Sequence, residues 1–347
     1  MTHIWMRTES RENEARAPLT PEGAAQLLAA GIAVTVEESR QRALPLAAYR
    51  DAGCAVAPEG SWPEAPAGAF VLGLKELPED GSPLRHRHIM FGHAFKGQPA
   101  GRVLLERFRA GGGTLLDLEY LVDETGRRVA AFGYWAGFAG AAVTLLDWAA
   151  QARGGRCGPV GAYASAEAMV AAVKAEMEGL APNPRALVIG ALGRVGTGAT
   201  DFCGRVGVPV TGWDMAETAG GGPFPEVLEH ELFFNCILAR PGCPVFVPAE
   251  AVNAPRALRV IGDIACDPTS DFSPVKVYDR STTWEEPVLR VAESPVLDVM
   301  AIDNLPSMLP AESSQDFAAQ LLPSLLVLDA PDETVWTRAE ATFRKHL

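Results

Sequence analysis

The chain has 347 residues, of which 48% are hydrophobic and 21% are charged, and its formal net charge is -13 at pH 7. This length exceeds the usual size of one hydrophobic core, so we expect two domains, and the composition argues against a disordered or fibrous class. The negative charge argues against a general nucleic-acid surface or an anionic-membrane surface.

Membrane and metal-binding segments are not expected from the sequence. No run approaches the about 18 consecutive apolar residues of a membrane span, and the first residues lack the apolar core of a signal peptide. We therefore expect a cytoplasmic protein. The six cysteines show no CxxC spacing, which argues against a zinc site or a disulfide framework and favours buried free thiols.

Short apolar runs alternate with helical patterns over the first 130 residues. Thr20 followed by Pro21 predicts a helix start, with Thr20 as the N-cap. The alternation predicts βαβ units that feed a parallel sheet. The predicted strands are 3–6, 33–39, 54–58, 70–76, 88–95 and 113–121, and the predicted helices are 21–31, 44–53 and 104–112.

The segment 132–152 is apolar on nearly all sides and rich in small residues, which predicts a buried helix connecting two domains. Beyond it we predict an alanine-rich helix and then the strands 186–190, 210–214, 231–237, 257–265 and 274–278, before two final helices at 307–328 and 333–346. The expected fold is α/β, with two Rossmann-like domains whose parallel sheets are flanked by helices and an active site in the interdomain cleft. We expect residues 1–132 plus about 310–347 to form the substrate domain and 133–309 to form the NAD-binding domain.

A glycine turn marks the predicted cofactor site. Gly190, Gly193 and Gly196 follow an apolar strand and open a helix, where backbone N–H groups and the helix dipole attract a pyrophosphate. Asp214 ends the next strand and could accept hydrogen bonds from a ribose diol, which favours NAD over NADP. Arg194 could pair with a phosphate of either cofactor. The plainer alternative is a turn needed only for tight packing of strand and helix.

Two pairs of polar residues follow predicted strands in the first domain. Lys75 and Glu76 follow one strand, and His93 and Lys96 follow the next. The carboxyl ends of parallel strands are where open α/β sheets bind ligands, so Lys75 and His93 are candidates for proton transfer. The plainer alternatives are a solvated lysine at a strand end and a structural histidine.

Several segments together resemble the NAD-dependent, lysine-forming saccharopine dehydrogenases, which are related to alanine dehydrogenase. The resemblance runs from about residue 7 to residue 345. The segments that carry it are EARAPLTPEG (14–23), GLKELP (73–78), FGHAFKGQ (91–98), GRRVAAFGYWAGFAGAA (126–142), VIGALGRVGTGA (188–199) and IDNLPSMLP (302–310).

The resemblance implies NAD-dependent, reversible cleavage of saccharopine to L-lysine and 2-oxoglutarate, with Lys75 and His93 as acid–base groups. It implies these substrate contacts: Arg16, Gln98, Arg128, Phe132, Ala265, Cys266 and Asp267. It implies these cofactor contacts: Arg127, Gly193, Arg194, Asp214, Thr218, Ile264, Ile302, Asp303, Asn304 and Leu305. It also implies a monomer. The carboxylates of saccharopine suit Arg16, Arg128 and Lys96, because guanidinium and ammonium groups bind carboxylates through charge-assisted hydrogen bonds.

Alternatives remain open for some of these residues. Glu76 and Glu119 either tune Lys75 and His93 or are solvated acids at strand ends. Lys75 could act instead as a Schiff-base nucleophile, a role we rank lower because the hydride reaction forms its imine between the substrates.

The sequence departs from the family pattern at Val195, Ala265, Cys266 and Asn304. Within the enzymes, the alternative is therefore an opine-type or alanine-type dehydrogenase that uses another pair of amino acid and 2-oxo acid. The alternative outside the enzymes is a non-catalytic NAD-binding sensor.

Overall fold

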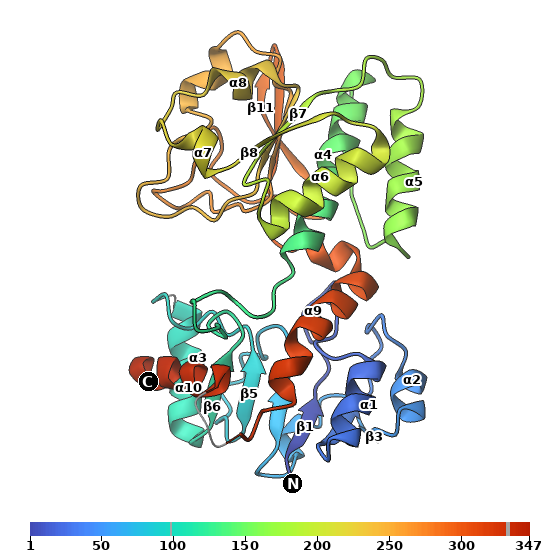
Figure 1. Ribbon diagram of the computed structural model, residues 1–347, viewed down its shortest axis with the longest axis vertical. Helices are drawn as coiled ribbons and strands as arrows, with labels where there is room; N and C mark the ends of the chain where they lie inside the picture. The colour runs from blue at the N-terminus through green and yellow to red at the C-terminus, as the bar shows by residue number, and fades with distance from the viewer. Residues whose placement is uncertain (98, 331–333) are drawn as a thin grey trace. The chain divides into compact units, whose positions relative to one another are not determined.

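The computed structural model describes residues 1–97, 99–330 and 334–347, and within them the chain divides into two compact units. The first unit consists of Met1–Ala131 and Pro310–Leu347, and the second unit consists of Phe132–Leu309. Each unit contains one six-stranded sheet with helices against it (Figure 1). The predicted α/β class is confirmed, apart from one antiparallel edge strand in the second unit.

The sheet of the first unit is parallel throughout and has the strand order β3-β2-β1-β4-β5-β6. Successive strands run outward from β1 in one direction and from β4 in the other. Open α/β sheets bind ligands at such a reversal, outside the carboxyl ends of the strands. The strands are β1 (His3–Met6), β2 (Ala33–Glu37), β3 (Ala55–Ala57), β4 (Phe70–Leu72), β5 (Arg87–Met90) and β6 (Thr114–Asp117).

Helices from both ends of the chain build the first unit. The Thr20 side chain accepts a hydrogen bond from the N–H of Gly23 at 3.1 Å, which confirms Thr20 as the N-cap of α1. The last helix, α10, packs against β6, and its Phe343 ring lies edge-on to Phe108. The helices are α1 (Pro21–Ala29), α2 (Leu46–Asp51), η1 (Trp62–Glu64), α3 (Pro99–Gly111), α9 (Pro310–Leu325) and α10 (Val335–His346).

The sheet of the second unit has the strand order β11-β12-β10-β9-β7-β8, and β11 is antiparallel to β12. The predicted strand at 274–278 is wrong, because this segment makes only an isolated bridge between Val275 and Val247. The sequence analysis did not predict the hairpin of β11 (Val288–Glu293) and β12 (Val296–Met300). The strands are β7 (Ala186–Ile189), β8 (Val210–Trp213), β9 (Leu232–Asn235), β10 (Val260–Asp263), β11 (Val288–Glu293) and β12 (Val296–Met300).

The long helix α4 is buried in the second unit, as the sequence predicts. It lies close to α6 because glycines bring the backbones together: a Cβ on Gly137 would lie 1.8 Å from the carbonyl oxygen of Val195, and one on Gly198 would lie 1.9 Å from that of Tyr134. The helices are α4 (Gly133–Ala152), α5 (Ala166–Met177), α6 (Arg194–Val206), α7 (Met215–Thr218), α8 (Pro225–Glu229), η2 (Ala249–Asn253) and η3 (Leu305–Met308).

Within the described part of the chain, no helix combines the length and the apolar character needed to cross a membrane. All six cysteines are free thiols, but only Cys54, Cys203 and Cys236 are buried. The expectation of buried thiols is therefore wrong for Cys157, Cys243 and Cys266, which are partly exposed.

Candidate active site

Four neighbouring strands of the first sheet end at one edge, and a basic or acidic residue follows each of them. Arg7 follows β1 directly, Lys75 lies three residues after β4, His93 three after β5 and Glu119 two after β6. Because β1, β4, β5 and β6 are parallel neighbours, the topology brings these residues to the same edge of the sheet.

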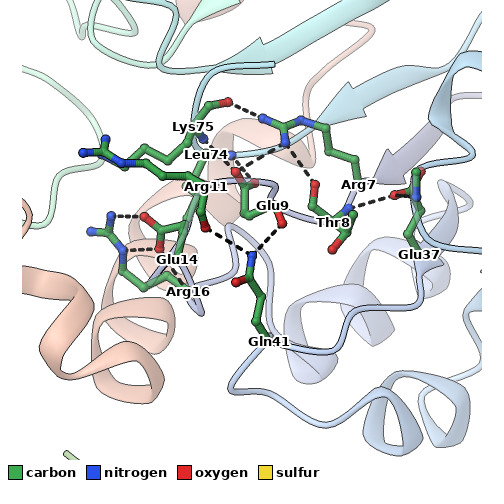
Figure 2. Close-up of polar contacts among 11 residues, drawn as sticks. Arg7, Thr8, Glu9, Arg11, Glu14, Arg16, Glu37, Gln41, Leu74 and Lys75 are labelled. Atoms are coloured by element: carbon green, nitrogen blue, oxygen red, sulfur yellow. Dashed lines mark hydrogen bonds and ion pairs between the residues drawn. The ribbon is translucent and has the colours of Figure 1, made fainter. Parts of the chain in front are cut away.

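Lys75 lies beside a cluster of charges from the loop after β1, as Figure 2 shows. Burial lowers the pKa of the Lys75 ammonium below its ordinary value, and the positive charge of Arg16 lowers it further. The carboxylate of Glu14 opposes this shift. A lowered pKa makes more of the neutral amine available near pH 7, which a proton acceptor needs.

Arg16 and Glu14 form a buried, two-pronged ion pair. Nε and Nη2 of Arg16 donate to the two carboxylate oxygens of Glu14 at 2.7 and 2.6 Å, and the side chains are 3% and 0% exposed. Burial acts to raise the pKa of Glu14, but the hydrogen bond and charge of Arg16 hold it below its ordinary value. Glu14 was missed by the sequence prediction, although it lies two residues from Arg16.

His93 lies between two carboxylates from neighbouring strand ends. Its Nε2 is 3.5 Å from Oε1 of Glu76, and its Nδ1 is 3.6 Å from Oε2 of Glu119. The His93 backbone has φ +48°, a left-handed conformation that residues other than glycine adopt rarely. Such a conformation is typical of functional sites, where the surrounding structure holds it in place.

Glu119 joins several of the predicted residues. Its Oε1 accepts a hydrogen bond from Nζ of Lys96 at 2.9 Å and lies 3.8 Å from Nη2 of Arg128. Burial acts to raise the pKa of Glu119, but Lys96, Arg128 and His93 together lower it. Glu119 is therefore an ionised carboxylate that contacts Lys96, Arg128 and His93, and it is not an isolated solvated acid.

Asp117 was missed by the sequence prediction. It is fully buried at the end of β6, and its carboxylate accepts the backbone N–H of Gly92 at 3.3 Å and that of Glu119 at 2.9 Å. Burial raises its pKa to about 6. Asp117 thus links the loop that carries His93 to the backbone of Glu119.

Three residues with predicted contacts lie outside the clusters described so far. Arg127 is exposed in a turn where its backbone N–H donates to Asp123 at 3.0 Å. Phe132 is the first residue of the second unit and the N-cap residue of α4. Gln98 lies outside the described residues. Their predicted contacts with substrate or cofactor stay predictions.

The glycine turn of the second unit lies between β7 and α6. Gly190 has φ +88°, which favours glycine, and Gly193 is the N-cap of α6. A Cβ on Gly196 would lie 2.1 Å from the carbonyl oxygen of Gly190, so only glycine fits there. A Cβ on Gly193 would meet only that same carbonyl within 4 Å, at 3.3 Å. The helix start is therefore open on the side of Gly193, and its geometry fits a dinucleotide pyrophosphate.

Asp214 follows β8 as predicted, and its carboxylate is held in place by backbone groups. Its Oδ2 accepts the N–H of Leu192 at 3.1 Å, and its Oδ1 accepts the N–H of Met215 at 2.9 Å. The Thr218 hydroxyl donates to the carbonyl of Asp214 at 2.9 Å, and Arg194 is exposed at the start of α6. The arrangement fits an adenosine ribose whose diol donates to Asp214.

The remaining predicted residues follow β10 and β12, at the same edge of the second sheet. Ile264, Ile302 and Leu305 are buried, whereas Asp267 and Asp303 are exposed. The partly exposed residues are Ala265, Cys266 and Asn304. Burial raises the pKa of the Cys266 thiol to about 12, so this cysteine is not an activated thiolate.

Within the described residues, no three His, Cys, Asp or Glu side chains gather in a way that could hold a metal ion. The side chains that gather at the first sheet offer an amine, an imidazole, carboxylates and guanidinium groups.

Comparison with known proteins identifies the family. Residues 5–139 match the model of the alanine dehydrogenase/PNT N-terminal domain. A solved L-alanine dehydrogenase superposes with a TM-score of 0.68 at 18% identity, covering 100% of this chain and 94% of that one, which shows a shared fold.

Two fungal relatives are much closer in sequence. Saccharopine dehydrogenase (NAD(+), L-lysine-forming) of Schizosaccharomyces pombe is 44% identical, and the match covers 98% of this chain and 97% of the relative. The enzyme of the same name from Neurospora crassa is 45% identical, with 99% and 95% covered. At this identity over nearly the whole length, the chain belongs to the family of NAD(+)-dependent, L-lysine-forming saccharopine dehydrogenases.

Proposed function

We propose that this protein catalyses the NAD-dependent cleavage of saccharopine to L-lysine and 2-oxoglutarate, and the reverse condensation. The observation that carries the proposal is the half-buried Lys75, whose pKa is lowered by burial, at the same sheet edge as a histidine held between two carboxylates. The names of the fungal relatives supply the substrate and the cofactor.

Substrate recognition falls to the cations of the first unit. Saccharopine carries three carboxylates, and we assign them to Arg16, Arg128 and Lys96. Each of these cations already faces an acidic side chain of the protein, so a substrate carboxylate must share it with Glu14 or Glu119. These acids hold the cations in position and reduce the net positive charge of the site.

Lys75 acts as the base in the oxidative direction. When bound, NAD supplies the hydride acceptor, and Lys75 takes the proton from the secondary amine of the substrate as the carbon is oxidised. His93 then shuttles protons while water adds to the imine and the carbinolamine breaks down. Glu76 and Glu119 face the two ring nitrogens of the imidazole and orient it.

Bound NAD is assigned to the second unit. The glycine turn leaves room for the pyrophosphate through Gly190, Gly193 and Gly196. Asp214 accepts hydrogen bonds from the ribose diol, which favours NAD over NADP. We assign further cofactor contacts to Arg127, Arg194, Thr218, Ile264 and the segment 302–305. The contacts of Phe132 and the segment 265–267 are assigned to the substrate. We further propose that the protein is a cytoplasmic monomer.

The direct test follows NADH consumption with 2-oxoglutarate while lysine, ornithine or ammonia is added in separate assays. Turnover with lysine alone supports the saccharopine assignment. Turnover with another amine would favour an opine-type or alanine-type dehydrogenase. Tight NAD binding without turnover of any amine would favour a non-catalytic sensor.

The variant Lys75→Met tests the role of the amine. General acid–base groups contribute about 10²–10⁴-fold to the rate, so we expect a loss of turnover in that range. The dissociation constant of NAD, measured by fluorescence titration, should stay unchanged, because the glycine turn belongs to the other unit. Turnover near that of the unmodified enzyme would overturn the assignment of Lys75.

A further inference from the structure

The backbone of Lys75 is held by two side chains rather than by sheet pairing. Past the end of β4, the last ladder-like contact is the bond from the N–H of Phe91 to the carbonyl of Leu74 at 2.9 Å. The next residue, Lys75, donates its N–H to Oε2 of Glu9 at 2.9 Å, and its carbonyl accepts from Nη2 of Arg7. Figure 2 shows both contacts.

Glu9 and Arg7 also hold each other and the residues beside Lys75. Oε1 of Glu9 accepts the N–H of Leu74 at 2.7 Å, and Nη1 of Arg7 lies 3.3 Å from Oε2 of Glu9. The two side chains are only 5% and 2% exposed. A Cβ on Gly73 would lie 2.4 Å from Nε of Arg7, so the guanidinium lies directly against the strand end.

A buried ion pair is weak evidence for stability, because desolvation of the two charges offsets most of their attraction. Here both partners point at the backbone of one residue, and charge-assisted hydrogen bonds to backbone groups are directional. Catalytic groups must be held within about 0.5 Å of their productive geometry, which requires support from the surrounding residues. The placement of the pair therefore points to a role in positioning.

We propose that Arg7 and Glu9 are positioning residues that clamp the backbone of Lys75 and so aim its amine at the substrate nitrogen. The inference rests on the proposed role of Lys75 in proton transfer. Neither side chain is assigned a contact with substrate or cofactor, so the clamp acts through Lys75 alone.

The variant Glu9→Gln tests the clamp with little change of shape. An amide has one carbonyl oxygen, so it can accept only one of the two backbone N–H groups and turns its NH₂ toward the other. We expect kcat to fall about 10- to 100-fold, by analogy with the loss of a hydrogen-bond partner that orients a metal ligand. The KM values for lysine and 2-oxoglutarate and the dissociation constant of NAD should change less than threefold.

Glu37→Gln is the matched control. Glu37 is also a buried carboxylate. Its Oε2 accepts the backbone N–H groups of Thr8 at 2.9 Å and Gly60 at 3.0 Å, its Oε1 accepts the indole N–H of Trp5 at 3.0 Å, and neither oxygen bonds to Lys75. A merely structural role predicts that both variants lose thermal stability and kcat to a similar degree. The clamp predicts a much larger fall of kcat in Glu9→Gln at an equal loss of Tm.

The pH profile gives a second readout. If the clamp is lost and the amine of Lys75 moves toward solvent, its pKa rises toward the ordinary value, since burial is what lowers it. The acid limb of the oxidative reaction should therefore move to higher pH in Glu9→Gln and stay in place in Glu37→Gln.

The outcomes separate the clamp from the proposed function. If Lys75→Met keeps its turnover, the proposed role of Lys75 in proton transfer is wrong, whatever the result for Glu9→Gln. If Lys75→Met loses turnover while Glu9→Gln matches Glu37→Gln in kcat and pH profile, the clamp is wrong. Should Glu9→Gln fail to fold, Arg7→Lys decides in the same way, because a lysine keeps the charge but cannot hold the Lys75 carbonyl and Glu9 with one planar group.

Discussion

The two candidate sites are built in opposite ways. In the first unit, side chains hold the reactive groups: Glu14 holds Arg16, and Glu119 holds Lys96. In the second unit, the backbone forms the site, because Gly196 lets the turn and α6 approach and Leu192 fixes Asp214 through its N–H. A site made of backbone depends on a few glycines that are close in sequence. A site made of side-chain pairs depends on residues that meet only after folding.

The glycine site should break on the addition of one methyl group. In Gly196→Ala the new Cβ would lie 2.1 Å from the carbonyl oxygen of Gly190, a backbone atom that has little freedom to move. Overpacking of this kind costs roughly 1–3 kcal/mol, so we expect NAD affinity to fall about 10- to 100-fold and Tm to fall as well. The dissociation constant of NAD, from fluorescence titration, is the measurement.

Gly204→Ala is the control for this variant. Gly204 lies in the same helix, is exposed, and a Cβ there would meet no atom within 4 Å. Alanine is the better helix former by about 0.5–1 kcal/mol, so this variant should gain slight stability and bind NAD normally. Equal NAD affinities for the two variants would contradict the close-approach role of Gly196.

The same contrast explains what the sequence could predict. The glycine turn and Asp214 are a local pattern of strand, turn and helix, so their placement was predictable from spacing alone. Lys75 and His93 were predictable as strand-end residues. Two acids near them were missed, Glu14 in the loop after β1 and Asp117 at the end of β6, because their proximity depends on the order of the strands in the sheet. The strand wrongly predicted at 274–278 shows the same limit, because an apolar alternation does not reveal whether a partner strand is available.

A side-chain network in the second unit, built around Asp147, should affect stability without affecting catalysis. Asp147 is fully buried in α4 and accepts the N–H of Cys157 at 2.8 Å. Burial and, to a smaller extent, the negative charge of Asp298 raise the pKa of Asp147 to about 7. Because the folded state binds this proton more tightly, the stabilisation is fully present below the unfolded pKa of about 3.9 and is lost as the pH rises through about 7.

We therefore expect the protein to lose about 1–2 kcal/mol of unfolding free energy between about pH 6 and pH 8. In Asp147→Asn this part of the pH dependence should disappear, because the amide does not titrate and can donate to Asp298 while accepting from Cys157. Denaturant unfolding at both pH values measures it. An unchanged pH dependence in Asp147→Asn would show that Asp147 does not titrate in this range, and a changed dissociation constant of NAD would contradict its separation from the cofactor site.

The smallest expected effect concerns an aromatic pair that joins the loop of His93 to the last helix. Phe95 lies between His93 and Lys96, and its ring stacks on His346 of the last helix, with centroids 4.6 Å apart and planes at 21°. Phe95 also lies edge-on to the ring of Tyr120, with centroids 5.0 Å apart. An aromatic pair contributes about 0.5–1.5 kcal/mol, so His346→Ala should lower kcat about two- to tenfold by loosening the loop. His346→Phe should restore kcat because it keeps a stacked ring, and the exposed neighbour Lys345 gives the control Lys345→Ala. Equal kcat values for His346→Ala and Lys345→Ala would show that the stacked pair does not hold the loop of His93.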